Sequence, residues 1–336
     1  MTVPLKYKAI FFSAIAQRQA YCLFYIKCII DGEHNIMVDE LKMIFVFVDG
    51  FGLGEKDASK NPVYAADTPN LDHIFANYDV IATDASLDVP GLPQSATGQT
   101  AIFTGINAPM LLGRHLNAQP SATLKKVLNE DNLFKRLMKA GLQVTNANVY
   151  RQEYLDRMND PAEKRYKPSV SSVMTMSAGL PFRMVEEYRN GKGIYHDITG
   201  RIIVESGYDA EIITPKEAAH RLYSISREND FTLFEHFMSD IIGHKMDMGL
   251  AIEEIELLDA FVGELLKLAD PEKDIIFITS DHGNIEDVSI KTHTLNKVPT
   301  IIIGGNHKSR TVKIRSLLDI MPAVLEIFGL PEVKES

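Results

Sequence analysis

The feature of the sequence that most constrains the fold is an apolar run that ends close to an Asp-His-Gly tripeptide. Residues 275–278 are an unbroken run of Ile and Phe, and Asp281, His282 and Gly283 follow shortly after it. Such runs are typical of strands buried on both faces, which build the parallel sheets of α/β proteins. Because ligands bind at the carboxyl edge of these sheets, the carboxylate and the imidazole are expected there. A simple turn with a surface histidine is the alternative for this tripeptide alone.

Two further acidic residues follow predicted strands in the same way. Residues 43–48 form a second strand of the buried type, and Asp49 comes directly after it. Residues 231–237 form another strand, which leads to Asp240 and, four residues on, to His244. In a helical turn, that spacing places both side chains on one face. We therefore expect three strand ends to bring carboxylates to one edge of the sheet.

Carboxylates crowded at one edge repel one another unless cations hold them together. The potential ligands are three carboxylates, three imidazoles and one hydroxyl: Asp49, Asp240, Asp281, His244, His282, His293 and Ser95. Oxygen and imidazole ligands suit Mn²⁺ or Zn²⁺. Seven ligands are too many for one such ion and enough for two, and paired metal ions are used in phosphoryl transfer.

Ser95 lies where an irregular loop enters a predicted helix. A hydroxyl at such a position is commonly a helix cap. The same position also favours a bound phosphate, because free backbone N–H groups and the helix dipole point at it. The residues around Ser95 leave both interpretations open.

The motifs around these residues resemble those of the alkaline phosphatase superfamily, and most closely its branch of cofactor-independent phosphoglycerate mutases and phosphopentomutases. Five segments match in the family's order: VDGFG (48–52), QSATGQ (94–99), SDIIGH (239–244), SDHGN (280–284) and HTLNKVP (293–299). The resemblance implies that Ser95 is the nucleophile that becomes phosphorylated. It also implies two metal sites, whose ligands would be Asp240, His244 and His293 for one ion and Asp49, Asp281, His282 and the Ser95 oxygen for the other.

The resemblance implies an α/β fold, with an alkaline-phosphatase-like core whose mostly parallel sheet is flanked by helices, and a small inserted cap. We expect residues 41–150 and 229–336 to form the metal-binding core. Residues 151–228 are more polar and irregular, and we expect them to form the cap. This cap is smaller than the caps of both mutases, and Gln99 stands where a His is usual in them. Basic residues that could bind a substrate phosphate, or be ordinary surface charges, are Arg114, His115, Arg151, Arg183 and Lys192.

The first forty residues differ in character from the rest of the chain. Polar residues interrupt their apolar runs, which are too short to span a bilayer. We expect residues 1–40 to be peripheral, with residues 1–36 possible upstream sequence from a wrongly assigned start codon. A native N-terminal helix packed on the core is the alternative. Both cysteines, Cys22 and Cys28, fall in this segment, so the core carries no disulfide framework, which fits the cytoplasm.

The formal net charge of the 336-residue chain is -10, which argues against a broad nucleic-acid-binding face. We expect no stable membrane association, and a monomer or homodimer. The function that these observations favour is phosphomutase-like phosphoryl transfer on a small phosphorylated metabolite, with two divalent ions, Mn²⁺ preferred over Zn²⁺. A phosphomonoesterase or phosphodiesterase of the same superfamily is the alternative. A non-catalytic metal-binding protein and a membrane-attached protein are further alternatives, and a sulfatase is disfavoured because its nucleophile lies in a different motif.

Overall fold

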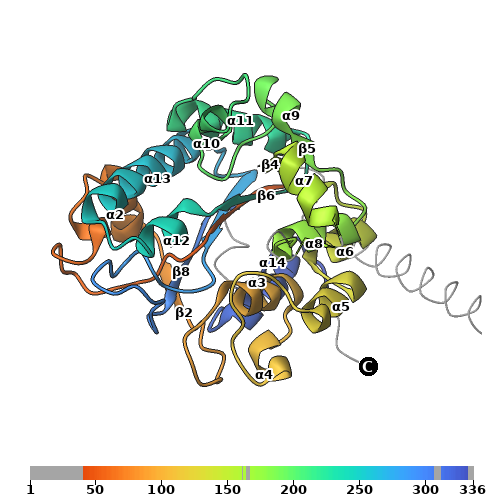
Figure 1. The fold of residues 1–336 in the computed structure, drawn as a ribbon, viewed down its shortest axis with the longest axis horizontal. Helices are drawn as coiled ribbons and strands as arrows, with labels where there is room; N and C mark the ends of the chain where they lie inside the picture. Colours follow the sequence, from red (N-terminus) through yellow and green to blue (C-terminus); the bar gives the residue numbers. More distant parts are fainter. Residues whose placement is uncertain (1–40, 161, 164–166, 306–311, 332–336) are drawn as a thin grey trace, which may run out of the picture. The chain divides into compact units, whose positions relative to one another are not determined.

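The computed structural model describes residues 41–160, 162–163, 167–305 and 312–331. The expectations for residues 1–40 therefore lie outside the described residues. A six-stranded sheet with the order β2-β8-β7-β1-β6-β3 lies at the centre of the fold (Figure 1). Its strands are β1 (Lys42–Val48), β2 (Val80–Thr83), β3 (Val144–Asn146), β6 (Phe231–His236), β7 (Asp274–Thr279) and β8 (Val298–Gly304). A second, two-stranded sheet pairs β4 (Val149–Tyr150) with β5 (Arg183–Met184).

The main sheet is mostly parallel, as the sequence predicts. Strands β6 and β7 both pair with β1 in parallel, and β3 pairs with β6 in parallel. Only β8, among the described strands of this sheet, runs the other way, because it pairs antiparallel with both β7 and β2. Phe47 lies opposite Glu235 on one side and Thr279 on the other. The carboxyl ends of β1, β6 and β7 therefore lie at one level, at one edge of the sheet.

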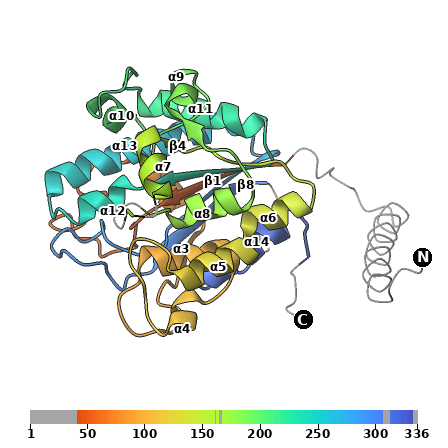
Figure 2. The same ribbon diagram turned by 45° about the vertical axis from the view of Figure 1, so that its right-hand side comes forward.

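Helices cover both faces of this sheet (Figure 2). The described α-helices are α2 (Pro69–Asn77), α3 (Ser95–Thr104), α4 (Ala108–Leu112), α5 (Ala122–Glu130), α6 (Leu133–Lys139), α7 (Gln152–Asn159), α8 (Val170–Ser177), α9 (Val185–Arg189), α10 (Arg201–Glu205), α11 (Pro215–Arg227), α12 (Met238–Gly243), α13 (Met248–Leu268) and α14 (Ile320–Ile327). Short 3₁₀ helices occur at η2 (Pro62–Tyr64) and η3 (Leu317–Asp319). Helices α2, α11 and α13 pack on the face that carries Ile44 and Val46, and α3, α6, α8 and α14 pack on the face that carries Phe45 and Phe47.

Alternation along β1 explains the two cores. Successive side chains of a strand point to opposite faces, so an apolar run without interruption supplies both layers at once. Residues 43–47 have no exposed surface. Phe45 stacks on Phe277 of the neighbouring strand, with ring centroids 4.8 Å apart. The buried strands β1 and β7 are therefore a rigid support for the loops that follow them.

The residues that precede three of the helices differ in their capping contacts. Thr214 caps α11 by accepting a hydrogen bond from the Glu217 backbone N–H, with Pro215 as the first helical residue. Thr68 precedes α2, but its side chain makes no capping hydrogen bond. Ser95 is not a helix cap, because it is the first residue of α3 and Gln94 occupies the cap position. The Ser95 hydroxyl is therefore not required for the start of the helix.

The polar segment between residues 151 and 228 contributes to both helical layers. Helix α8 packs against α5, α3 and α6, and α11 packs against α13 and the sheet. The described residues from Leu41 onward belong to one compact unit. Within the described residues, no helix combines the length and the apolar character needed to cross a membrane.

Candidate metal centre

Two strand ends form a cluster that we call the buried cluster: Asp49, Asp281 and His282. Asp49 follows β1 directly, and Asp281 and His282 come shortly after β7. One potential ligand atom from each residue lies within 4.8 Å of the other two. The Nε2 atom of His282 is 3.3 Å from Oδ1 of Asp49 and 3.7 Å from Oδ2 of Asp281. Parallel pairing of β1 with β7 thus brings together residues more than 230 positions apart.

Asp240, His244 and His293 form a second group, the outer cluster, whose ligand atoms also lie within 4.8 Å of one another. Asp240 does not end a strand, as the sequence suggested, but lies in the first turn of α12, and His244 caps that helix. Oδ1 of Asp240 is 3.3 Å from Nε2 of His293 and 3.5 Å from Nε2 of His244. The predicted helical spacing of Asp240 and His244 is correct. Helix α12, and not the end of β6, places both side chains close to His293.

Ser95 lies against the buried cluster. Its Oγ atom is 3.0 Å from Nε2 of His282, and the side chain is buried. Helix α3 reaches this position because it packs closely on the Asp281 loop at Gly98. A Cβ atom at Gly98 would lie 2.9 Å from both Cβ and the carbonyl oxygen of Asp281, so a larger residue would push the helix away. Since Ser95 begins α3, the free N–H groups of its first turn lie beside the hydroxyl.

The two carboxyl groups of the buried cluster resist ionisation. Burial, followed by the negative charge of Asp49, raises the pKa of Asp281 to about 8. Burial also raises the pKa of Asp49 well above its usual range, with further contributions from Asp240 and Glu235. Glu235 lies deeper on β6, and burial raises its pKa to about 8 although Ser171 donates a hydrogen bond to it. Without a cation, this pocket therefore favours neutral, protonated carboxyl groups.

The outer cluster has the opposite balance. Burial opposes the ionisation of Asp240, but the hydrogen bonds from His293 and Asn284 and the imidazole of His282 outweigh it and lower the pKa of Asp240 to about 2. Asn284 donates to Oδ1 of Asp240 at 2.7 Å. This carboxylate is thus ionised and already surrounded by groups that favour its charge.

The tautomers of the histidines fit metal binding. Nδ1 of His244 is 2.8 Å from the Lys291 carbonyl oxygen, and Nδ1 of His293 is 2.8 Å from the Pro93 carbonyl oxygen. A carbonyl only accepts hydrogen bonds, so Nδ1 of each ring carries a hydrogen. Nε2 of a protonated His293 donates to Asp240, and once that hydrogen is lost, Nε2 of each neutral ring offers a lone pair to a metal ion. This arrangement is characteristic of metal-ligating histidines.

Two contacts would be unfavourable without a cation. The Nε2 atoms of His244 and His293 are only 3.2 Å apart, so two lone pairs face each other when both rings are neutral with the hydrogen on Nδ1. Among the described residues, no donor forms a hydrogen bond to the buried Oδ1 atom of Asp49. A divalent cation in each cluster would satisfy these atoms, so the residues present fit two metal ions. Asp240, His244 and His293 would hold one ion, and Asp49, Asp281, His282 and Ser95 would hold the other.

The sequence did not indicate which neighbours support these ligands. Gln99 donates to Oδ2 of Asp281 at 3.3 Å, although the sequence marked it only as a departure from the mutase pattern. Asn284 supports Asp240 from within the SDHGN motif. Glu286 accepts hydrogen bonds from the backbone N–H groups of Gly52 and Asn284. Its only sequence signal is its place two residues after Asn284.

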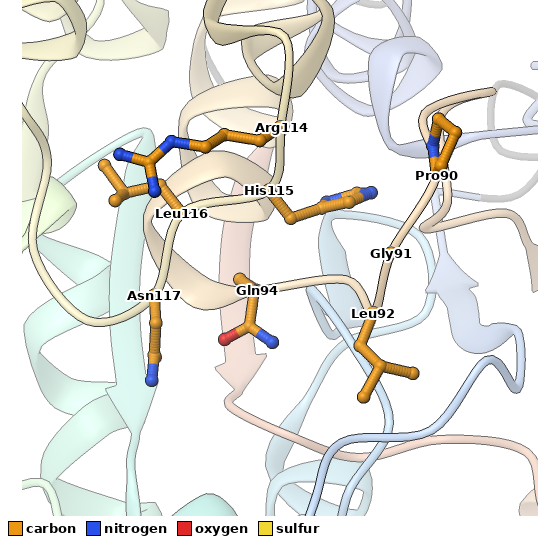
Figure 3. Close-up of a pocket in the computed structure, with 8 residues that line it drawn as sticks. All are labelled: Pro90, Gly91, Leu92, Gln94, Arg114, His115, Leu116 and Asn117. Carbon is orange, nitrogen blue, oxygen red and sulfur yellow. The ribbon is translucent and has the colours of Figure 1, made fainter.

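The basic residues suggested for substrate binding lie in different places. Arg114 and His115 line a cavity of about 550 Å³ together with Gln94, the residue before Ser95 (Figure 3). The loop that lines the other side of this cavity includes Leu92 and continues to Pro93, which binds His293 of the outer cluster. The cavity therefore adjoins both the nucleophile candidate and the metal centre.

The three other basic residues have no such position. Arg183 donates to the carbonyl oxygens of Asn146 and Lys192 and to the Thr145 hydroxyl, so it ties β5 to β3. Lys192 is exposed on the turn after α9. Arg151 precedes α7 and donates to the hydroxyl of Ser206.

Comparison with known proteins identifies the family of this chain. A family model described as Metalloenzyme superfamily matches residues 41–332, which include both clusters and Ser95. The chain belongs to the Metalloenzyme superfamily. The resemblance to the alkaline phosphatase superfamily that the motifs indicated is thereby confirmed.

Relatives of this chain include mutases. The chain is 30% identical over 152 residues to a 2,3-bisphosphoglycerate-independent phosphoglycerate mutase of Mycoplasmopsis synoviae, a match that covers 44% of this chain and 30% of that mutase. A mutase of the same description from Desulforudis audaxviator is 30% identical over 112 residues, which cover 32% of this chain and 22% of that protein. The chain thus matches less than a third of the length of either relative.

Solved structures share the fold. The PH0037 protein of Pyrococcus horikoshii superposes with a TM-score of 0.54 at 15% identity, over 88% of this chain and 99% of that one. The lipoteichoic acid synthase LtaP of Listeria monocytogenes superposes with a TM-score of 0.51 at 11% identity, over 88% of this chain and 73% of that one. These similarities support the alkaline-phosphatase-like α/β fold of the chain.

Proposed function

We propose that this chain is a two-metal phosphoryl-transfer enzyme that works through a phosphoserine at Ser95, and that it acts as a phosphomutase on a small phosphorylated metabolite. The observation that carries the proposal is the position of the Ser95 hydroxyl, 3.0 Å from Nε2 of His282 in a pocket with two potential metal sites. A hydroxyl that is not needed as a helix cap is available as a nucleophile. Mn²⁺ is the proposed ion and Zn²⁺ the alternative, because both accept oxygen and imidazole ligands.

The residues of the chain have distinct roles in this proposal. Bound divalent cations would lower the pKa of the serine hydroxyl and offset the charge on the phosphoryl oxygens. Ser95 forms a bond to phosphorus while the ester bond to the substrate oxygen breaks. The N–H groups of the first turn of α3 favour the negative charge that collects there. A second hydroxyl of the substrate then takes the phosphoryl group from phosphoserine, and Ser95 is regenerated.

The fate of the phosphoryl group separates a mutase from a phosphatase. The mutase relatives support the mutase, which must keep water away while the substrate reorients. We propose that the irregular part of residues 151–228 is the cap that does so. Its small size and Gln99 favour the alternative, a phosphomonoesterase or phosphodiesterase in which water takes the group. The proposed location is the cytoplasm.

We propose further that the cavity beside Gln94 binds the part of the substrate that is not transferred. Arg114 is exposed at its rim, and no ion pair to Arg114 occurs among the described residues. Arg114→Gln is expected to raise KM by about tenfold with little change in kcat, because a charge-assisted hydrogen bond contributes about 1.5–3 kcal/mol. Arg201 of α10 is also exposed. Arg201→Gln is therefore the control and should leave KM unchanged.

The test of the main proposal is product analysis with the Mn²⁺-loaded full chain. The protein is incubated with phosphosugars or phosphoglycerates, and Ser95 is examined for phosphate by mass spectrometry. Isomerised ester without inorganic phosphate supports the mutase, and inorganic phosphate alone supports the phosphatase. Ser95→Ala should abolish both products, whereas Thr100→Val should not, because that hydroxyl bonds only within α3, to Ala96. Turnover of Ser95→Ala above a few per cent of wild type contradicts the phosphoserine.

A further inference from the structure

A buried carboxylate outside both clusters joins the loops that carry them. Glu286 is 1% exposed, and both of its oxygens accept hydrogen bonds. Oε2 accepts from the backbone N–H groups of Gly52 at 3.0 Å and Asn284 at 2.7 Å. Oε1 accepts from the side-chain amide of Asn296 at 3.1 Å and from the Thr294 hydroxyl. The side chain is thus the centre of four hydrogen bonds from three points of the chain.

Each of these points lies next to metal ligands. Gly52 belongs to the loop that starts at Asp49, Asn284 follows His282 by two residues, and Thr294 follows His293 directly. The first two loops supply the buried cluster, and the third supplies the outer cluster. One carboxylate therefore holds ligand-bearing segments of both clusters.

A second path leads from Glu286 to the outer cluster. The backbone of Asn284 donates to Glu286, and the side chain of the same residue donates to Asp240 at 2.7 Å. The position of Asn284 that orients Asp240 is therefore fixed partly by Glu286.

The glycines of two motifs fit this arrangement. A Cβ atom at Gly52 or at Gly283 would collide with the carboxylate of Glu286. The backbone passes so close to the carboxylate at these positions that only glycine fits without a shift. The glycines that end VDGFG and SDHG thus make room for Glu286, and not only for turns.

The four donors to Glu286 are neutral, and no described residue forms an ion pair with it. A carboxylate has about four acceptor positions and no donor, which matches this surrounding. We propose that Glu286 is a positioning residue that couples the two metal sites, because it fixes the loops of both clusters before the metal ions bind. This inference rests on the proposed function in one respect, namely that the clusters bind divalent metal ions.

The test is a titration of the metal-free full chain with Mn²⁺ by isothermal calorimetry, without substrate. Glu286→Leu should weaken binding at both sites by about 10–100-fold, the range found for groups that orient metal ligands. Glu286→Gln should weaken it less, because the amide oxygen still accepts from two backbone N–H groups. In the metal-free protein, hydrogen exchange should accelerate at residues 49–54 and 280–296 in the order wild type, Gln, Leu.

Glu264→Leu is the matched control. Glu264 is also a buried carboxylate, at 8% exposure, but it pairs with His220 of α11 and Lys267 of α13, outside these loops. It should leave Mn²⁺ affinity and loop exchange unchanged. If Glu286→Leu does not fold, the comparison of Glu286→Gln with wild type decides the question in the same assays.

Three results overturn the coupling: Glu286 variants that bind Mn²⁺ as wild type does, loss of affinity at one site only, or an equal loss in Glu264→Leu. A wild-type protein that binds no divalent metal contradicts the proposed function itself. Backbone links between the loops, such as the Ile285 N–H to the Gly50 carbonyl oxygen at 3.0 Å, remain in every variant. The variants therefore test the carboxylate and not the whole loop contact.

Discussion

The buried cluster lies inside the protein, whereas Asp240 and His244 of the outer cluster are partly exposed. The difference extends to charge. In the buried cluster burial raises the pKa of Asp281 to about 8, whereas in the outer cluster hydrogen bonds overcome burial and lower the pKa of Asp240 to about 2. The carboxyl groups of two similar sets of ligands thus differ in protonation, because Asp281 favours its neutral form and Asp240 is ionised.

The comparison shows how the protein prepares each site. Asp240 is ionised before a metal ion arrives, since His293 and Asn284 already favour its charge. The buried cluster has little such support, so a cation is the main group that could stabilise two ionised carboxylates there. Metal binding at the buried cluster is therefore expected to release protons from its carboxyl groups, whereas Asp240 of the outer cluster has already lost its proton at neutral pH.

The largest expected effect comes from removing one carboxylate from each cluster. Asp281→Asn and Asp240→Asn should each reduce phosphoryl transfer by more than about 100-fold, because a metal ligand is lost. In the metal-free protein, the two substitutions should change the free energy of unfolding in opposite directions. At pH 8 Asp281→Asn should raise the free energy of unfolding by about 1–3 kcal/mol, since an amide avoids the cost of keeping this carboxyl group protonated or of burying its charge. Asp240→Asn should lower it, because favourable hydrogen bonds to a charge are lost.

Urea unfolding with a chelator present measures both variants. Shifts of the same sign for Asp281→Asn and Asp240→Asn would contradict the contrast between the clusters.

The pH dependence of the metal-free protein sharpens the same contrast. Asp281 and Glu235 have folded pKa values of about 8 and lose their protons near pH 4 when unfolded. Between these values the folded state holds more protons, so stability should fall as pH rises from about 5 to 8. The expected slope is about 1.4 kcal/mol per pH unit for each group. Asp240 acts oppositely: its contribution is present above about pH 4 and is lost as pH falls toward 2.

Glu235→Gln provides the check on that slope. It should reduce the fall in the free energy of unfolding between about pH 5 and 8 by the part that one carboxyl group contributes. Urea unfolding at several pH values measures this change. Asp57→Asn is the control and should leave this part of the profile unchanged, because hydrogen bonds from Ser59 lower the pKa of Asp57. A stability that is flat from pH 5 to 8 in the wild type would show that these carboxyl groups are not held in the protonated form.

The smallest expected effects come from the amides that support each cluster. Asn284→Ala removes a donor to Asp240 at 2.7 Å, and Gln99→Ala removes a donor to Asp281 at 3.3 Å. Each should weaken Mn²⁺ binding mainly at its own cluster, by about 10–100-fold for Asn284 and less for Gln99, whose hydrogen bond is longer. Calorimetric titration of both variants should therefore resolve two sites with different losses. Equal losses at both sites would show that the clusters cannot be separated.

Much of the fold could be predicted because its signals are local. The unbroken apolar runs at residues 43–48 and 275–278 indicated strands buried on both faces, and both lie at the centre of the sheet. The antiparallel direction of β8 was not predictable in this way. Its sequence is as apolar as that of its neighbour, and direction depends on the loop that connects β7 with β8.

The candidate site was predictable in its ligand types and only partly in its geometry. The motifs identified the residues of both clusters, and the i, i+4 spacing of Asp240 and His244 is helical in the structure. The place of Asp240 in α12 and of Ser95 as the first residue of α3 could not be read from spacing, since each depends on where a helix begins. Helix starts depend on which backbone groups find partners, and those partners come from other parts of the chain.

The sequence by itself determined the parallel α/β core, the order of the motifs and the identity of the potential ligands, because these follow from residue type and short-range spacing. Only the tertiary structure decided that Asp281 favours its proton while Asp240 is ionised, and that Glu286 joins the loops of both clusters. Burial and hydrogen bonds set these properties. Both depend on groups that are distant in sequence, such as Gly52 and Glu286, and become neighbours only when the sheet brings their loops to one edge.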